Sequence, residues 1–203
     1  MEYVSNVMFW ISNGLLVPVI VGLLFFFIKG VFMLGSLFNQ YLQRNKQNKA
    51  LKESLQSLNK DNVLSLEPVL ETAPKTEFTN TAIQLYKLKN SPVHRNYRIS
   101  EFEITSDKEL GKSKALIKFG PILGLMGTLI PMGPALVGLS TGDIGSMAYN
   151  MQVAFATTVL GLFIGGVGFI LAQIRQRWIM SDLTNLDFIS ELMKDNGQST
   201  ISK

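Results

Sequence analysis

A pair of long apolar stretches determines how this chain can fold: Ile117–Leu139 and Val153–Gln173. Neither contains an acidic residue, and only the short segment Ser140–Gln152 separates them. About twenty apolar residues suffice for a helix to cross the hydrocarbon core of a bilayer. Because backbone polar groups in lipid must be satisfied within the segment, we expect the two stretches to form a transmembrane helical hairpin.

A third apolar stretch opens the chain, from about Val7 to Phe38. It is too long for the core of a signal peptide, and no positive residue precedes it, so we expect it to be retained. If Trp10 marks one membrane interface, a hydrocarbon core about 30 Å thick ends near Lys29. We interpret Lys29 as a side chain that snorkels to the opposite headgroups.

Composition favours a membrane protein. The chain of 203 residues is 47% hydrophobic and only 17% charged, and its mean hydropathy is positive. The low charged fraction, together with the positive mean hydropathy, is unusual for a soluble domain. The net charge is +4, but the basic residues are spread along loops and do not stripe one helix, which argues against nucleic-acid binding. Cysteine is absent, so disulfides and cysteine-ligated metals are excluded.

The basic residues also predict an orientation. Of nineteen lysines and arginines, none precedes Lys29 and none lies in Ser140–Gln152; fourteen lie from Arg44 to Lys118 and four follow the third span. By the positive-inside rule the N-terminus and the short loop lie outside, and the long loop and C-terminus lie in the cytoplasm. We therefore predict an all-α, multi-pass protein of the cytoplasmic (inner) membrane, with three transmembrane helices, N-out and C-in.

The polar segments are expected to form cytoplasmic helices. Leucines at helical spacing predict an amphipathic helix over Gln40–Lys60, and Ser106–Ala115 leads helically into the second span. Prolines break the segment between them into short pieces. The predicted organisation has four parts: a first span with its extension at 1–38, a cytoplasmic region at 39–116, a transmembrane hairpin at 117–174 with its outer loop at 140–152, and a C-terminal amphipathic helix at 175–203.

The positions of the acidic residues argue against a proton relay formed by this chain alone. All fifteen lie outside the predicted hydrocarbon core, and only Glu2 and Asp143 lie on the outer side. A proton relay normally needs a titratable group within the membrane, so a partner would have to supply one. The sequence contains no protease, P-loop or metal-binding pattern, and the lone His94 is expected in a solvated loop. We therefore predict no catalytic residue, no metal, no cofactor and no enzymatic activity.

Two threonines lie near the middle of the predicted hairpin. With the turn near Ile144, Thr128 comes sixteen residues before it and Thr158 fourteen after it. At 1.5 Å per residue, the two hydroxyls lie within roughly 3 Å of the same depth. Polar groups at one depth indicate a pore or a helix interface. The alternative is that each hydroxyl only bonds to a carbonyl of its own helix.

Two sequence motifs in the hairpin are similar to motifs of a known protein family. The second span carries P-x-x-G-L-x-G-T at Pro121, Gly124, Leu125, Gly127 and Thr128, and the third carries Thr158 followed by Gly161-Leu162. In this order and on this topology, they resemble the MotA/TolQ/ExbB proton channel family, in its three-span, TolQ/ExbB-like form. The chain departs from ExbB-like members at Val153, where they place a glutamate, and it lacks the fourth span of MotA.

The resemblance implies a motor subunit driven by the proton motive force. It implies that several copies in the lipid bilayer, as a homopentamer, surround a single-span ExbD/TolR/MotB-like partner with a membrane aspartate. Protons, with sodium as the alternative ion, would pass the pore-lining threonines Thr128, Thr158 and Thr157. The competing interpretation is a non-conducting helical scaffold of an envelope or transport complex.

Small residues and prolines are expected to shape the helix contacts and the pore. Glycines permit close approach of neighbouring helices, and we expect a lone three-span chain to leave these grooves to lipid, which favours an oligomer. Prolines remove backbone donors and favour a bend that shapes the outer end of the pore. The residues predicted for these roles are Gly120, Pro121, Gly124, Gly127, Pro131, Pro134, Gly161 and Gly165, and Gly168 continues the glycine spacing.

Overall fold

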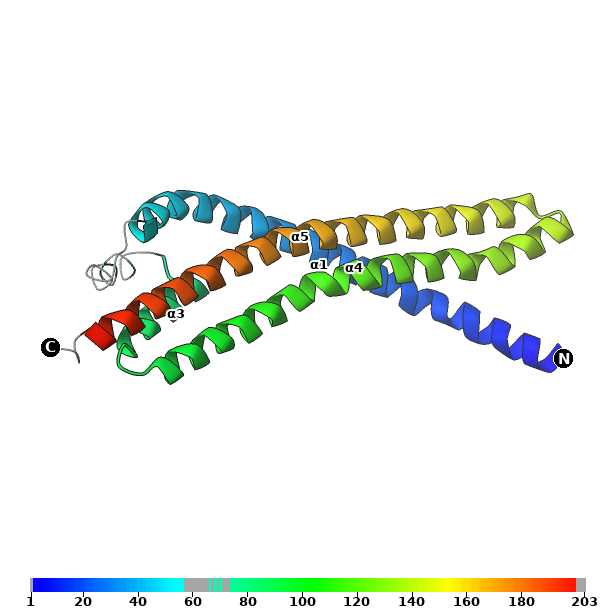
Figure 1. Cartoon of the computed structure of the whole chain (residues 1–203). Helices are drawn as coiled ribbons and strands as arrows, with labels where there is room; N and C mark the ends of the chain where they lie inside the picture. The colour runs from blue at the N-terminus through cyan, green and yellow to red at the C-terminus, as the bar shows by residue number, and fades with distance from the viewer. Residues whose placement is uncertain (1, 57–65, 67, 69, 71–73, 200–203) are drawn as a thin grey trace. The chain divides into compact units, whose positions relative to one another are not determined.

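The computed structural model describes residues 2–56, 66, 68, 70 and 74–199. Within these residues it consists of helices without strands: α1 (Glu2–Gln56), α3 (Glu77–Lys87), α4 (Pro92–Thr141) and α5 (Ile144–Ser199) (Figure 1). By length and apolar composition, α1, α4 and α5 can each cross a membrane. The predicted all-α fold with three membrane helices is confirmed.

The chain divides into two compact units. One comprises Met1–Leu37 and Lys112–Ala172 and contains the apolar parts of all three long helices; we call it the membrane unit. The other comprises Phe38–Gly111 and Gln173–Lys203, and we call it the extramembrane unit. Each unit has its own packing and is described separately.

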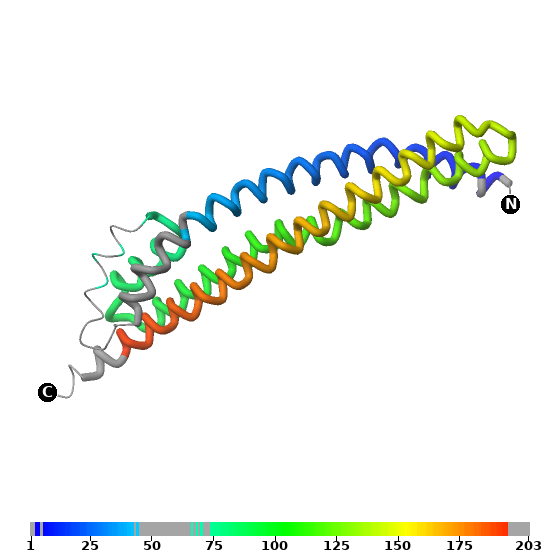
Figure 2. Tube along the Cα trace, turned by 90° about the horizontal axis from the view of Figure 1, so that it is seen from above, coloured from blue at the N-terminus to red at the C-terminus, as the bar shows by residue number. Residues whose placement is uncertain are grey.

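In the membrane unit, α4 and α5 lie side by side, as the two views agree (Figures 1 and 2). They pack through backbone: a Cβ built on Gly161 would lie 2.6 Å from the carbonyl oxygen of Gly120 and 2.7 Å from the Cα of Gly124. Such distances leave no room for a side chain. The first span packs on this pair through aromatic rings, because Phe26 stacks on Phe119 and Phe27 lies against Phe163, with ring centroids 5.7 and 5.5 Å apart.

The link between α4 and α5 is shorter than the sequence suggested. Helix α4 continues to Thr141 and α5 begins at Ile144, so most of the expected loop Ser140–Gln152 is helical. Gly142 has a φ of 77°, the left-handed conformation that ends many helices. Asp143 then accepts a hydrogen bond from the backbone of Ser146 at 3.0 Å and so caps α5.

The prolines of α4 do not interrupt it. Pro121, Pro131 and Pro134 all lie inside one continuous helix, and Pro131 is fully buried. Lipid-facing helices tolerate proline when neighbouring helices support the freed backbone groups. The predicted bend at Pro131 and Pro134 stays a prediction.

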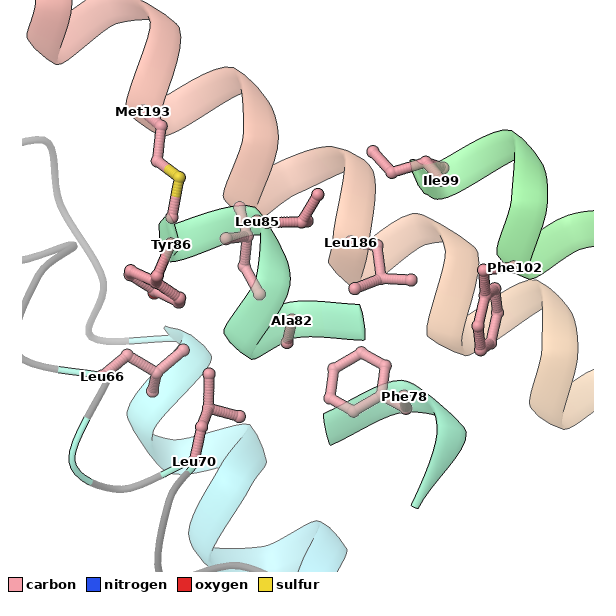
Figure 3. Close-up of a cluster of buried hydrophobic side chains, with 11 residues drawn as sticks. Leu66, Leu70, Phe78, Ala82, Leu85, Tyr86, Ile99, Phe102, Leu186 and Met193 are labelled. Carbon is pink, nitrogen blue, oxygen red and sulfur yellow. The ribbon is translucent and has the colours of Figure 1, made fainter. Parts of the chain in front are cut away.

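The extramembrane unit is built around large apolar side chains (Figure 3). Helix α3 starts with a capping box in which Thr76 and Thr79 exchange hydrogen bonds, and its buried face includes Phe78, Ala82 and Leu85. These pack with residues of α4, α5 and the segment before α3. The buried cluster is made of Leu66, Leu70, Phe78, Ala82, Leu85, Tyr86, Ile99, Phe102, Leu186, Ile189 and Met193.

The helices of this unit continue from the spans. The helix predicted over Gln40–Lys60 is present to Gln56, where α1 ends; residues 57–60 lie outside the described part. The lead-in Ser106–Ala115 is helical, although α4 already begins at Pro92. The C-terminal segment from Arg175 is helical to Ser199 as part of α5. His94 is exposed, as expected, but it lies in the first turn of α4 and not in a loop; its Nδ1 lies 2.7 Å from the hydroxyl of Ser91.

Candidate functional site

The register of α4 against α5 is fixed at the predicted threonine level. A Cβ built on Gly127 would lie 2.6 Å from the hydroxyl oxygen of Thr157. The two positions therefore face each other across the helix contact. Thr128 and Thr158 each come one residue later, so they lie close to the same level along the pair.

Thr128 and Thr158 also lie on the same side of the helix pair. One step along a helix turns the side chain by about 100°. Helices α4 and α5 run in opposite directions, so a step forward on each from Gly127 and Thr157 turns both side chains toward one side of the plane of the two axes. Both are partly exposed in the single chain. Thr157, which we predicted to line the pore with them, is instead buried between the helices, because it packs against Gly127 of α4.

The first span lies on the other side. On α4, Phe119 and Leu123 contact α1, and each comes one residue before a glycine that faces α5. Thr128 comes one residue after such a glycine, so it points the opposite way. Val167 of α5, which contacts Gly30 of α1, likewise precedes Gly168. The face with the two threonines is thus the one that α1 leaves open.

Each threonine hydroxyl is bonded to its own helix. Thr128 donates to the carbonyl of Leu125 at 2.7 Å, and Thr158 donates to that of Ala154 at 3.1 Å. Thr157 lies within reach of the carbonyls of Val153, at 3.1 Å, and Ala154, at 2.9 Å. A hydroxyl that donates in this way keeps lone pairs for accepting. The open face can therefore accept hydrogen bonds from water or from a protonated carboxyl group.

The same face is otherwise apolar and cannot carry a proton by titration. Exposed side chains around the threonines include Leu125, Met132 and Leu162. The only carboxylic acids in the membrane unit are Glu2 and Asp143, and Asp143 caps α5. Among the residues that the structure describes, no group of histidine and acidic side chains could hold a metal.

The glycines predicted for packing lie between α4 and α5 of one chain. A Cβ on Gly120 would lie 2.7 Å from the carbonyl oxygen of Gly161, and one on Gly165 would lie 2.9 Å from Cγ of Pro121. A Cβ on Gly168 would lie 2.7 Å from Cβ of Leu116. The expectation that a single chain leaves these grooves to lipid is therefore wrong, since the neighbouring helix fills them, and they provide no argument for an oligomer.

A family comparison covers the site and most of both units. The model of the MotA/TolQ/ExbB proton channel family matches residues 37–187, about three quarters of the chain. The chain belongs to this family. No curated protein and no solved structure matches it.

As a MotA/TolQ/ExbB family member, the chain is a multi-pass membrane protein and a subunit of a proton-channel type of complex. The matched region contains all of α4 and α5 as far as Asp187, and hence the open face with Thr128 and Thr158. The family is one of channels and transporters, not one of enzymes.

In this MotA/TolQ/ExbB member, sequence reasoning missed the buried polar groups of the extramembrane unit. Arg95 is 1% exposed; it donates to the hydroxyl and the carbonyl of Ser190, each at 3.3 Å, and to the carbonyls of Leu88 and Lys89 beyond the end of α3. Burial lowers the pKa of Arg95, and nearby Glu191 raises it. No sequence pattern indicates this role, because the acceptors are backbone and serine oxygens.

A second polar contact ties α1 to α5 in the same unit. Arg44 forms an ion pair with Asp182 and lies over the ring of Trp178, 5.0 Å from its centroid. Tyr41 stacks on the same ring. Burial raises the pKa of the Asp182 carboxyl, and Arg44 lowers it by charge attraction; burial dominates.

Proposed function

We propose that this chain forms a ring, most simply a homopentamer, around a single-span partner whose membrane aspartate carries protons. The chain would use the open face of α4 and α5 to line the passage. Movement of the partner as its aspartate gains and loses charge would do work in the envelope. The proposal places the protein in the inner membrane and takes the proton as the ion.

One observation carries this proposal: Thr128 and Thr158 share a level and a face that α1 leaves open. In-membrane polar side chains usually face a bundle interior or a water path. The membrane unit has no acid at this level, so the titrating group must come from elsewhere. A partner carboxylate completes the site without any change in the chain.

The hydroxyls would act without titrating. While a partner carboxylate exchanges its proton, Thr128 and Thr158 accept hydrogen bonds from its protonated form or from water beside it. Turned toward the passage, each can also donate to the ionised form. The hydroxyl pair would thus lower the cost of holding the carboxylate in a low-dielectric passage.

The test of this mechanism is proton flux in vesicles. The chain is reconstituted with the single-span protein that co-purifies with it, and flux is compared with that of Thr128→Val and Thr158→Val. Valine keeps the shape and removes the hydroxyl, so assembly should survive with a stability change of about 1 kcal/mol. We expect flux to fall at least tenfold in both variants.

Thr157→Val is the matched control, because the Thr157 hydroxyl is buried against α4. Its effect on flux should be much smaller. If both Thr128→Val and Thr158→Val assemble and conduct like the wild type, the hydroxyl mechanism is wrong. That result would favour a non-conducting scaffold, which the bonding of every one of these hydroxyls to its own helix also supports.

The proposed orientation has a separate test. The native chain has no cysteine, so single cysteines can be introduced and labelled with an impermeant reagent. Cysteines at Ser5 and Gly145 should react from outside, and those at Asn80 and Ser199 should react only from the cytoplasm. Outside labelling at Asn80 would contradict the N-out, C-in topology.

A further inference from the structure

A cavity of about 360 Å³ lies within the extramembrane unit, separate from the threonine face. It is bounded by α1 beyond Leu37, the start of α3, and the parts of α4 and α5 that belong to this unit. Its walls include Phe78, Ser106, Leu110, Arg175, Trp178 and Asp182. Binding pockets for small molecules usually combine such apolar walls with a few polar groups.

One cation in this cavity, the guanidinium of Arg175, has no counter-charge among the described residues. Arg175 is half-buried, and within the described part of the chain it makes no hydrogen bond or ion pair. Arg44, on another wall, is neutralised by Asp182. Of the other carboxylates at the cavity, Glu109 is exposed and has an interaction of its own, and Glu77 is exposed in the first turn of α3.

A second polar group at the cavity wall, the hydroxyl of Ser106, also lacks a hydrogen-bond partner among the described residues. Ser106 is 9% exposed, and among the described residues no hydrogen bond to its hydroxyl is found. A guanidinium and a hydroxyl therefore line a cavity in which neither has an acceptor or donor among the residues that the structure describes.

We propose that this cavity binds a small amphiphilic anion. Its carboxylate or phosphate head would accept hydrogen bonds from Arg175 and Ser106, since the guanidinium fork matches both head groups. Its apolar body would pack against Phe78, Leu110 and Trp178. The volume is at the low end of the range for ligand pockets, so the body is one ring or a short chain.

The test uses Trp178 as a reporter. The chain has two tryptophans, so Trp10→Phe leaves Trp178 alone, and the protein is placed in nanodiscs of zwitterionic phosphatidylcholine. Phenyl phosphate and benzoate are titrated as amphiphilic anions. Inorganic phosphate serves as a control that has the anionic head group without an apolar body, and benzyl alcohol as a control that has the apolar body without a charge. We expect a saturable change in Trp178 fluorescence with phenyl phosphate, benzoate or both, and their relative affinities identify the preferred head group.

Two arginine variants make the result specific. Arg175→Gln should weaken binding by roughly tenfold or more, as expected for loss of a charged hydrogen bond. Arg177→Gln is the matched control, because Arg177 is exposed and lies outside the cavity walls; its affinity should equal that of the wild type. Ser106→Ala should weaken binding less than Arg175→Gln.

Several outcomes would overturn the proposal. If neither anion produced a saturable change in Trp178 fluorescence, the cavity would be only a hydrated space and not a binding site. Equal affinity for benzyl alcohol would remove the requirement for charge, and equal affinity for inorganic phosphate would remove the role of the apolar walls. Equal effects of Arg175→Gln and Arg177→Gln would place the anion elsewhere. None of these results depends on proton flux, so the threonine mechanism is tested independently.

Discussion

The two units of this protein are built from the same helices but are held together by different means. In the membrane unit, the closest contacts join backbone to backbone at Gly120, Gly124 and Gly161. In the extramembrane unit, leucine, isoleucine and phenylalanine side chains form a core around α3. Water rewards burial of large apolar side chains, whereas lipid does not, so helices in lipid gain most from close approach. The surrounding medium explains the difference.

The strongest test of this comparison adds one methyl group to the membrane unit. In Gly161→Ala, the new Cβ would meet backbone atoms 2.6 and 2.7 Å away, and these cannot rotate aside. We expect the α4–α5 pair to lose about 3 kcal/mol of stability or more, measured by unfolding in mixed micelles. Gly166→Ala is the control, because nothing lies within 4 Å of its Cβ; it should be neutral or stabilise by up to about 1 kcal/mol.

Polar burial in the extramembrane unit is tested at Arg95. Arg95→Met keeps much of the volume but removes the donors to Ser190 and to the carbonyls beyond α3. We expect a loss of about 2–3 kcal/mol, seen as faster hydrogen exchange in α3 while the spans are unchanged. Arg98→Met removes an exposed arginine paired with Glu101 at 2.5 Å, and should cost under about 1 kcal/mol. Similar losses in both variants would contradict the role of the buried guanidinium.

The smallest effect is expected at Asp182, and it depends on pH. Burial raises its pKa in the folded state, so folding binds protons and the folded carboxylate is penalised once it ionises. The stability of the wild type relative to Asp182→Asn should therefore decrease as pH rises from the ordinary carboxyl pKa to above the raised value. Melting temperatures across the acid range provide the measurement. An opposite slope would mean that the attraction of Arg44 outweighs burial.

The membrane helices could be predicted from the sequence because lipid leaves few choices. Apolar length alone identifies the three spans, and a rise of 1.5 Å per residue placed Thr128 and Thr158 at one depth. The side on which they lie could not be predicted, because it depends on which residues of α4 contact α1. It also depends on the register of α4 against α5, which the contact between Gly127 and Thr157 sets.

The extramembrane unit was far less predictable. Its segments are polar and broken by prolines, and the leucine spacing indicated helices without indicating their partners. The bond between Arg95 and Ser190 joins residues 95 positions apart, and the cavity beside Arg175 brings together residues of α1, α3, α4 and α5. No local pattern records such pairings, because serine and backbone oxygens can accept a hydrogen bond at almost any position.

The two-residue link at Gly142 and Asp143 affects how the protein is made. It joins α4 to α5 directly, so their contacts can form one after another from the link, and each new contact closes only a short additional loop at little cost in chain entropy. The contacts of α1 with Phe119 and Phe163 instead close loops of about ninety residues or more, at greater cost. During biogenesis the hairpin is therefore the easier unit to form. We therefore expect the first span, although it is synthesised earliest, to dock onto a pair that is already assembled.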